Sequence, residues 1–353
     1  MSTTTQCING TNTSSSHEIS VHLCEGNVGR RGLSHVLLYQ YQGFWRTAKG
    51  IENVKDFQQN FKASHTDLII TTLPKSGTTW LKALAFAIIN RSNYPSSSSS
   101  SSKNYDQHPL LTISPHDLVP FVDFKQLNPD NSLLDFTKNS TTHDSPCRLI
   151  ATHIPYPSLP ESIKTTATKC KIVYLCRNPL DNFISMWLFM NKVREMPMLN
   201  NNNASLSMEE AFDFFCDGVQ EFGPYWDHVL GYWRESLKNP HKLLFVKYED
   251  LKKEPKAQIT RIAEFIGYGF SLEEENQGVI EEISSLCSFE NLKNLDVNKN
   301  GTWRGTVENK VFFRKGEVGD WKNYLTPIMI KRLDSLMEEK LHGSGLVFED
   351  YLP

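Results

Sequence analysis

A short turn between an apolar run and a helical pattern carries the residues best suited to chemistry in this sequence. Pro74 ends the β-branched run Leu68–Leu73, and Lys75–Thr79 then supplies a lysine, a glycine and three hydroxyl groups. An apolar helical pattern begins at Trp80. Free N–H groups at a helix N-terminus bind anions, and a glycine lets the main chain approach a phosphate closely. The turn therefore predicts an anion-binding loop in which Lys75 offsets charge on a leaving oxygen.

The order of residues in this loop differs from a Walker A motif. That motif has a glycine, four intervening residues and then Gly-Lys, whereas here the lysine precedes the glycine by two positions. Ser and Thr also cap ordinary helices, so a plain strand–helix turn is the alternative interpretation. The density of hydroxyl groups favours the anion site.

Polar side chains follow three further apolar runs that are too short for helices and predict buried strands. The runs are Arg148–Thr152, Lys171–Cys176 and Leu243–Lys247. His153 follows the first, Arg177 the second and Tyr248 the third. Each of them alone fits a solvated loop. Ligands of open parallel sheets bind beyond the carboxyl ends of the strands, so together with the lysine loop they predict a site for an anionic nucleotide.

Three of the polar segments suggest distinct roles at this edge. His153, beside the anion loop, is the best candidate for a general base. Arg177 precedes a helical pattern that contains Ser185, and a guanidinium with a helical serine suits a second phosphate. The run Arg314–Gly316 places two cations before a glycine and predicts another phosphate contact.

Helical patterns alternate with the predicted strands. They are Leu180–Lys192, Ser207–Glu221, Tyr225–Lys238 and Ala257–Phe265. This order predicts an α/β fold: a single domain with a central parallel sheet flanked by helices and a P-loop-like anion-binding loop. Residues 1–30 are rich in Ser, Thr and Asn and predict a disordered tail before a domain at 31–353. Ser96–Ser102 and Asn200–Asn203 predict flexible surface segments.

Composition and charge exclude several classes of protein. The formal net charge of −3 gives no excess of positive charge that would bind nucleic acid or an anionic membrane surface. The seven cysteines are scattered without a CxxC pair, which argues against a disulfide framework and a zinc site. We find no apolar core of a signal peptide, no membrane-spanning stretch and no carboxylate set for magnesium. We therefore expect a cytoplasmic protein that acts without a metal.

Four motifs of this chain resemble those of the cytosolic sulfotransferase family, and three further segments resemble its plant branch. The four are PKSGTTW at Pro74–Trp80, THIP at Thr152–Pro155, CRNPLDNFIS at Cys176–Ser185 and RKGEVGDWK at Arg314–Lys322. The three are YQGFW at Tyr41–Trp45, HDLVPF at His116–Phe121 and LGYWRESLKNP at Leu230–Pro240. The resemblance extends from about residue 36 to the end, with the motifs in the family's order and spacing.

The resemblance implies sulfonate transfer from 3′-phosphoadenosine 5′-phosphosulfate (PAPS) to a hydroxyl of a small acceptor. It assigns the 5′-phosphosulfate to Ser76, Gly77, Thr78 and Thr79, with Lys75 stabilising the leaving phosphate oxygen. It assigns the adenine to Trp80, Tyr248, Cys287 and Phe289, and the 3′-phosphate to Arg177, Ser185, Arg314, Lys315 and Gly316. His153 would deprotonate the acceptor, in a pocket of Phe44, Phe121, Phe124 and Phe189.

The chain departs from the animal members of this family at two places. Ala151 stands where they often have a lysine, two residues before the histidine. Of their C-terminal dimer motif, Lys322 and Thr326 remain, but Pro327 and Lys331 replace a valine and a glutamate. We therefore expect a monomer or a weak homodimer.

Two other functions stay open at this point. A P-loop-type small-molecule kinase needs a strand-terminal aspartate for magnesium, for which Asp250 is a loose candidate. A catalytically inactive nucleotide-binding protein would bind the donor without turnover, although Lys75 and His153 argue against it. The resemblance allows several acceptors: flavonoids and other phenolics, hydroxyjasmonates, brassinosteroids and desulfoglucosinolates.

Overall fold

The computed structural model describes residues 29–33, 36–94, 108–123, 147–196 and 205–348. Most of the predicted tail 1–30 and both predicted flexible segments, Ser96–Ser102 and Asn200–Asn203, lie outside the described residues. Arg30 is described, and it pairs with Leu38 at the start of an antiparallel hairpin.

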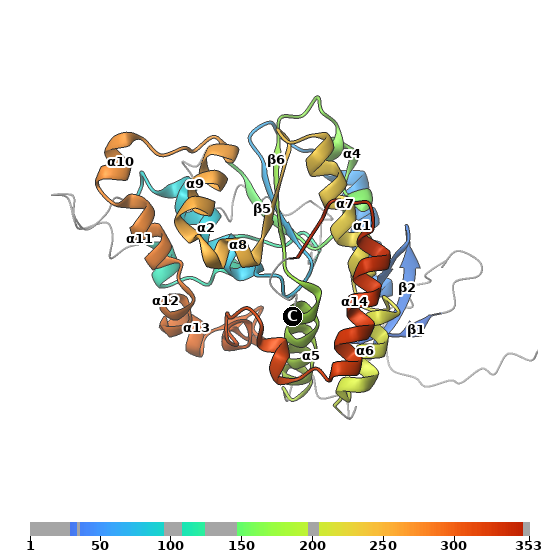
Figure 1. The fold of residues 1–353 in the computed structure, drawn as a ribbon. Coiled ribbons are helices and arrows are strands. Elements are labelled where there is room, and N and C mark those ends of the chain that lie inside the picture. Colours follow the sequence, from blue (N-terminus) through green and yellow to red (C-terminus); the bar gives the residue numbers. More distant parts are fainter. Residues whose placement is uncertain (1–28, 34–35, 95–107, 124–146, 197–204, 349–353) are drawn as a thin grey trace, which may run out of the picture.

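A parallel sheet of four strands stands at the centre of the molecule (Figure 1). Its order is β5-β4-β6-β7, formed by β4 (Leu68–Thr72), β5 (Leu149–Thr152), β6 (Lys171–Cys176) and β7 (Leu243–Lys247). Ile70 of β4 lies opposite Ala151 of β5 and Val173 of β6. The predicted parallel α/β arrangement is confirmed.

Side chains of the strands alternate between two hydrophobic cores. Ile69, Ile150 and Ile172 belong to one core, and Ile70 and Val173 belong to the other. All of these side chains are buried, because helices cover both faces of the sheet. A parallel sheet covered on both sides favours continuous apolar runs over alternating ones, which is the pattern that the sequence shows.

Two groups of helices provide this cover, and Figure 1 shows one group on each side of the strands. The first group includes α2 (Thr78–Asn90), α8 (Tyr248–Lys253), α9 (Pro255–Ile266), α10 (Leu272–Asn276), α11 (Val279–Leu286), α12 (Phe289–Asn294) and α13 (Asp296–Asn300). The second includes α1 (Ala48–Asn60), α4 (Glu161–Lys164), α6 (Met208–Cys216), α7 (Tyr225–Lys238) and α14 (Pro327–Leu341). Helix α5 (Pro179–Arg194) follows β6 and begins at the sheet edge where the site lies.

Short elements complete the described part of the chain. The N-terminal hairpin consists of β1 (Arg30–Arg31), β2 (Leu37–Tyr41) and β3 (Phe44–Arg46), and a small ribbon pairs β8 (Thr302–Trp303) with β9 (Val307–Glu308). Helix α3 (Pro115–Leu118) and the 3₁₀ turns Pro109–Leu111, Tyr156–Ser158, Asn309–Phe312 and Asp320–Asn323 connect the larger elements.

One predicted helix is shorter in the structure than the sequence suggested. The pattern predicted Ser207–Glu221, but α6 ends at Cys216. Gly218 then has a positive φ of 73° and the Val219 N–H donates to the Phe214 carbonyl, so the chain turns away from the helix axis. The residues after this turn reach the site described below.

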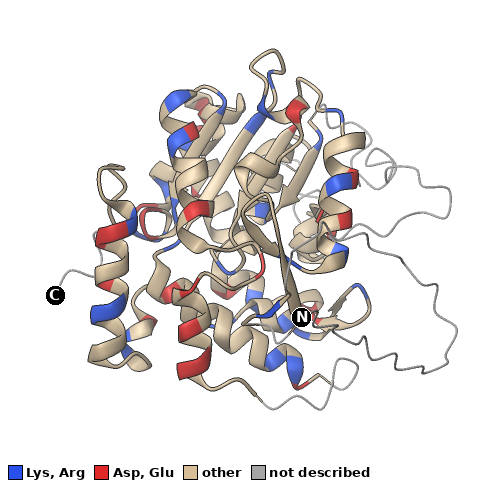
Figure 2. Ribbon diagram, turned by 90° about the vertical axis from the view of Figure 1, so that its right-hand side faces the viewer, with Lys and Arg blue, Asp and Glu red and all other residues tan. Residues whose placement is uncertain are grey.

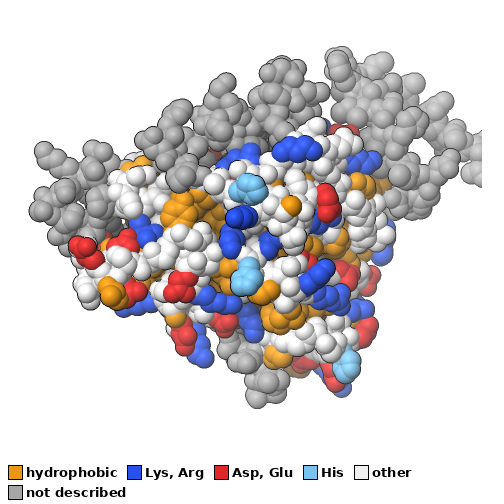
Figure 3. Space-filling view, turned by 90° about the horizontal axis from the view of Figure 1, so that it is seen from above, with side chains coloured by type: hydrophobic (Ala, Val, Ile, Leu, Met, Phe, Trp, Pro, Cys, Tyr) orange, Lys and Arg blue, Asp and Glu red, His pale blue; other side chains and the backbone are white. Residues whose placement is uncertain are grey.

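Acidic and basic residues are interspersed along the helices in the ribbon of Figure 2. The space-filling view in Figure 3 shows the same mixture on another face, with apolar side chains between the charges. In the part of the chain that the structure describes, no helix meets the length and hydrophobicity of a membrane span.

Candidate active site

The anion loop joins β4 to α2. Gly77 occupies the N-cap position of α2 with φ 106°, and a Cβ at this residue would lie 2.8 Å from the Tyr248 ring. A side chain therefore does not fit there, and the first N–H groups of the helix stay accessible to a ligand. Asn182 of α5 braces the loop, because its Nδ2 donates to the Pro74 carbonyl (2.9 Å) and to the Ser76 hydroxyl (3.1 Å).

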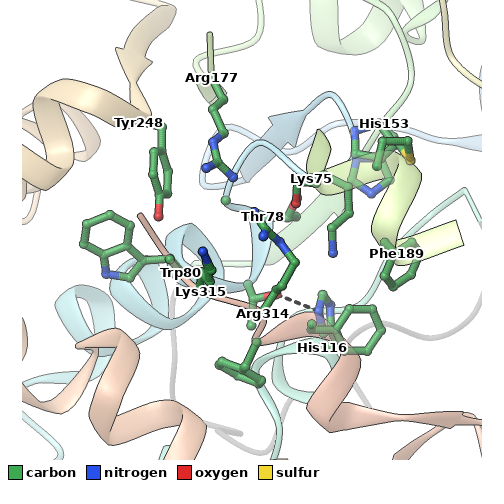
Figure 4. Close-up of a pocket in the computed structure, with 18 of the residues that line it drawn as sticks. Lys75, Thr78, Trp80, His116, His153, Arg177, Phe189, Tyr248, Arg314 and Lys315 are labelled. Carbon is green, nitrogen blue, oxygen red and sulfur yellow. Dashed lines mark hydrogen bonds between the residues drawn. The ribbon is translucent and has the colours of Figure 1, made fainter. Parts of the chain in front are cut away.

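Lys75 projects from this loop toward the centre of the cavity (Figure 4). Its backbone has φ 69°, an uncommon conformation for a residue with a side chain. Burial, followed by repulsion from Arg177, Arg314 and Lys192, lowers the pKa of Lys75 to about 7. A lysine gathered with other cations is stabilised in its charged form by a bound anion.

His153 lies at the end of β5 and is 6% exposed. Its Nδ1 donates to the Thr72 carbonyl at 2.8 Å, which assigns the ring proton to Nδ1 and the lone pair to Nε2. Burial is the largest effect on the imidazole and lowers the pKa of His153 to about 3. The ring is therefore neutral at pH 7, as a general base must be before it accepts a proton.

Buried neighbours form hydrogen bonds with the main chain of His153 and with Thr152 before it. The Asp123 carboxylate accepts from the His153 N–H and from the Thr152 hydroxyl, both at 2.6 Å. The His228 Nε2 donates to the His153 carbonyl at 3.0 Å, and the Tyr174 hydroxyl contacts the other nitrogen of His228. These contacts fix the end of β5, so the imidazole cannot reorient freely.

A second cationic group lies about the start of α5. Arg177 is 5% exposed, stacks 4.6 Å from the Tyr248 ring centroid and donates to the Glu317 carbonyl. Arg314 and Lys315 share the carboxylate of Asp320, whose pKa falls to about 2. The pKa of this carboxyl is lowered by hydrogen bonds from Lys315 and Arg314, against the opposing effect of burial.

Both arginines of this group keep an unused donor. The Nε atoms of Arg177 and Arg314 are buried and have no hydrogen-bond partner among the described residues. Gly316 has φ 68°, and a Cβ there would lie 2.5 Å from the Phe289 ring, so the loop packs directly on that aromatic side chain. Unpaired guanidinium donors beside a tight glycine loop fit a phosphate group.

One cavity of about 370 Å³ connects the Lys75 loop with the group formed by Arg177, Arg314 and Lys315. Trp80 and Tyr248 lie on one side of it in Figure 4, while His153, Phe189 and His116 lie on the other. The wall therefore has an aromatic and cationic end toward α2, α8 and the Arg314 loop, and an apolar end around His153. Apolar walls with few polar groups are typical of small-molecule sites.

Most residues singled out from the sequence line this cavity. They are Lys75, Gly77, Thr78, Thr79, Trp80, Phe121, His153, Arg177, Ser185, Phe189, Tyr248, Cys287, Phe289, Arg314, Lys315 and Gly316. The Ser76 hydroxyl accepts a hydrogen bond from Asn182, which stabilises the loop. Phe44 does not line the cavity, because it is buried in β3 and packs edge-on against His228 with ring centroids 6.5 Å apart. Phe124 lies outside the described residues.

A buried histidine of the site escaped sequence reasoning. His116 lines the cavity, its Nε2 lies 2.9 Å from the Thr79 hydroxyl, and its Nδ1 lies 3.3 Å from the Lys82 ammonium. Lysine can only donate, so His116 accepts at Nδ1 and donates from Nε2 to Thr79. Burial, followed by the charge of Lys82, holds the pKa of His116 well below its usual range. The sequence signal was Lys82 itself, a charge within the apolar pattern of α2.

Aromatic and acidic residues from distant segments were also missed. Phe222, Trp303 and Phe312 line the apolar end, and Glu249 accepts hydrogen bonds from the Asn178 main chain and side chain. These residues carry no local signature, because aromatic and buried acidic residues occur in many unrelated positions. Within the described residues, no group of three or more His, Cys, Asp or Glu is arranged to hold a metal ion.

Comparison with known proteins places this geometry in a family. A family model described as "Sulfotransferase domain" matches residues 65–345. Cytosolic sulfotransferase 15 of Arabidopsis thaliana is 46% identical, with 90% of this chain and 84% of that protein covered. Flavonol 4′-sulfotransferase of Flaveria chlorifolia is 44% identical, with 93% and 94% covered.

Solved structures have the same fold. A putative steroid sulphotransferase of Arabidopsis thaliana superimposes with a TM-score of 0.67 at 37% identity, covering 92% of this chain and 93% of that one. A mouse sulfotransferase complexed with PAP gives a TM-score of 0.61 at 24% identity, with 87% and 96% covered. At that identity the mouse protein supports the fold alone.

Proposed function

We propose that this chain, which belongs to the sulfotransferase family, transfers a sulfonate group from PAPS to a hydroxyl of a small acceptor. The observation that carries the proposal is the pairing of two anion sites across one cavity. Lys75 and the N-terminus of α2 form the first, and Arg177 with Arg314 forms the second. A nucleotide with phosphate groups on both its 5′ and 3′ positions fits this pairing.

The residues of the anion loop and the cavity wall suit such a donor. The loop Ser76–Thr79 would hold the 5′-phosphosulfate with its main-chain N–H groups and hydroxyls. Arg177, Ser185 and the loop Arg314–Gly316 would hold the 3′-phosphate. The rings of Trp80, Tyr248 and Phe289 and the thiol of Cys287 would line the adenine between them.

The chemistry then divides between His153 and Lys75. The donor supplies a sulfonate group whose bond to a phosphate oxygen breaks as the acceptor oxygen attacks the sulfur. His153 takes the acceptor's proton at Nε2, because Nδ1 already donates to the Thr72 carbonyl. Lys75 neutralises the charge that develops on the leaving phosphate oxygen. The sulfonyl group carries less charge than a phosphoryl group, so these cations suffice without a metal ion.

The acceptor class follows from the apolar end of the cavity. Phe121, Phe189, Phe222, Trp303 and Phe312 provide flat apolar surfaces around the imidazole. Such walls suit an aromatic or apolar acceptor that presents one hydroxyl to the base. We favour a flavonoid or another phenolic, with a hydroxyjasmonate or a steroid as further candidates. The name of the Arabidopsis relative supports a plant cytosolic enzyme. Pro327 and Lys331, which replace residues of the animal dimer motif, favour a monomer or weak homodimer.

An assay with labelled sulfonate donor tests the proposal. PAPS carrying ³⁵S is incubated with the protein and a panel of phenols, hydroxylated acids and steroids, with and without EDTA. We expect labelled product with at least one phenol and no dependence on added Mg²⁺. Labelled phosphate transfer from a nucleoside triphosphate, in place of sulfonate transfer, would instead support the kinase function. Binding of PAPS without turnover on any acceptor would support the inactive protein.

A further inference from the structure

The apolar end of the cavity contains a short polar segment. Gln220, Glu221 and Phe222 all line the cavity, and they follow the turn that ends α6. Leu33, Met186 and Val193 form the wall near this end and contribute only apolar side chains. An amide and a carboxyl group in this apolar wall need an explanation, because burying polar groups without partners is unfavourable.

Gln220 has no partner for its side-chain amide. The residue is 2% exposed, and neither its Nε2 nor its Oε1 has a hydrogen bond among the described residues. Its main chain is fully used: the N–H donates to the Gly218 carbonyl and the carbonyl accepts from Gly223. The loop is therefore held in place by its backbone, while the amide is left for another group.

Glu221 differs from Gln220 in being half-buried, and it lines the same cavity. No hydrogen bond or ion pair of its carboxylate occurs within the described part of the chain. Burial raises the pKa of Glu221, while Arg46 lowers it and Asp123 raises it further. Arg46 does not line the cavity, and its guanidinium lies 4.0 Å from the Phe222 ring centroid. Arg46 is thus the cation whose charge acts on Glu221, and it lies outside the cavity wall.

This segment lies close to the proposed base. The ring of Phe222 stands edge-on to the His153 imidazole, with centroids 5.3 Å apart. Glu221, the residue before Phe222, lines the same cavity as His153. An acceptor whose hydroxyl meets the imidazole can bring its far end to Glu221 and Gln220.

We propose that Glu221 and Gln220 bind a second polar group of the acceptor, a hydroxyl or an amine, at a distance from the hydroxyl that is sulfonated. This inference rests on the proposed sulfonate transfer. Glu221 accepts a hydrogen bond from that group, and the Gln220 amide adds a donor or an acceptor beside it. An acceptor with a carboxylate at the same place meets the charge of Glu221, while Arg46, the cation that acts on Glu221, is not among the described residues that line the cavity. The site therefore selects against such an acceptor.

Matched acceptors test the inference. We would compare 2-naphthol with 6-amino-2-naphthol, 2,6-dihydroxynaphthalene and 6-hydroxy-2-naphthoate, and repeat the series on phenol and biphenyl frames to vary the reach. Labelled PAPS gives kcat/KM for each acceptor. With the best frame, we expect the wild type to prefer the diol or amine to the mono-ol by about tenfold, and the mono-ol to the carboxylate by about tenfold, since unpaired buried polar groups discriminate strongly.

Variants of Glu221 separate charge from shape. Glu221→Gln should bring the carboxylate acceptor to within about threefold of the mono-ol, and Glu221→Leu should abolish the preference for the diol, because each removes the group that discriminates. The readout is the ratio of kcat/KM between acceptors within each variant, so a general change in turnover does not affect the comparison. Glu209→Gln removes one acidic charge on the exposed side of α6 and is the control, which should leave all ratios unchanged.

The results distinguish this inference from the proposed function. Sulfonate transfer with equal ratios in the wild type and in both Glu221 variants, on every frame, would overturn the role of Glu221. A wild-type protein that binds adenosine 3′,5′-bisphosphate but sulfonates none of the acceptors would overturn the proposed function instead. Unchanged affinity of Glu221→Gln for that nucleotide verifies its fold, and this conservative variant alone decides the charge selection if Glu221→Leu does not fold.

Discussion

The two ends of the cavity are built in different ways. At the donor end, most lining side chains come from segments that follow strands β4, β6 and β7, and the others come from the junction of α11 and α12 and from one short loop at Arg314–Gly316. At the acceptor end, the walls come from five or more separated segments, including the turns around Phe121, Phe222 and Phe312. The donor end is a property of local motifs, whereas the acceptor end depends on how distant loops meet.

The electrostatics of the two ends also differ. The cations of the donor end are held by buried carboxylates: Asp320 holds Arg314 and Lys315, and Asp181 lies 3.7 Å from Arg177. The acceptor end contains the neutral imidazole of His153 in an apolar setting. Tight binding of a multiply charged donor and proton transfer from a neutral acceptor require such contrasting surroundings. Substitutions should therefore affect either binding or turnover, depending on the end in which they lie.

The largest effect is expected at the acceptor end. His153→Ala removes the proton acceptor and should lower kcat by about a hundredfold or more. The affinity for adenosine 3′,5′-bisphosphate should stay near the wild-type value, because the proposed phosphate-binding groups are the N-terminus of α2, Arg177 and Arg314 rather than His153. Labelled-donor turnover and calorimetry on the same preparation measure both. A variant that retains near-full activity on a phenol would remove His153 from the mechanism.

Arg177→Ala should separate the two phosphate sites of the donor end. Charge-assisted hydrogen bonds contribute about 1.5–3 kcal/mol each, so the loss should be about ten- to a hundredfold in affinity for adenosine 3′,5′-bisphosphate. Adenosine 5′-phosphate lacks the 3′-phosphate and should bind the variant about as well as the wild type. Calorimetry with both nucleotides checks this, and equal affinity of the wild type for the two would contradict the donor assignment.

Gly316→Ala should weaken the donor end by crowding. A Cβ at Gly316 would lie 2.5 Å from the Phe289 ring, so ring and loop must shift, and we expect about a tenfold loss in affinity for adenosine 3′,5′-bisphosphate. Gly343→Ala is the matched control, since Gly343 has the same φ of 68° and no atom within 4 Å of a Cβ. Both variants should lose about 1–2 kcal/mol of stability from the left-handed backbone. Thermal unfolding measures this loss, and only Gly316→Ala should lose nucleotide affinity. Equal nucleotide affinity of the two variants would count against the packing argument.

The smallest effect concerns pH. Lys75 has a pKa of about 7, so it is charged below that pH and increasingly neutral above it. A bound anion favours the charged form and raises this pKa, so binding above pH 7 must take up a proton. The affinity for adenosine 3′,5′-bisphosphate should therefore fall above pH 7 by at most about tenfold per unit.

Two calorimetric comparisons check this pH dependence. The heat of binding at pH 8 should differ between buffers of different ionisation enthalpy, which reports the proton uptake. Lys75→Arg keeps the positive charge at all these pH values and should flatten the profile. The same slope in the wild type and in Lys75→Arg would exclude Lys75 as the group that titrates.

The sequence by itself determined the strands, the parallel sheet and the donor end. Apolar runs interrupted by Pro, Lys or Arg are local signals, and the carboxyl ends of parallel strands meet at one edge in any such sheet. Lys75, His153, Arg177 and Tyr248 could therefore be brought together without coordinates. The family resemblance supplied the expected roles of Trp80 and the Arg314–Gly316 loop, which the structure places on the same cavity.

Only the tertiary structure decided the acceptor end. Phe44 matched a family position but packs on His228 behind the site, while Phe222 and Glu221 reach the cavity because α6 ends early at Cys216. The left-handed turn at Gly218 that redirects the chain follows a helical pattern that predicted no break. The burial that keeps His153 neutral likewise arises from contacts between distant segments. Such contacts depend on side-chain packing across the whole fold, and no local pattern of residues encodes them.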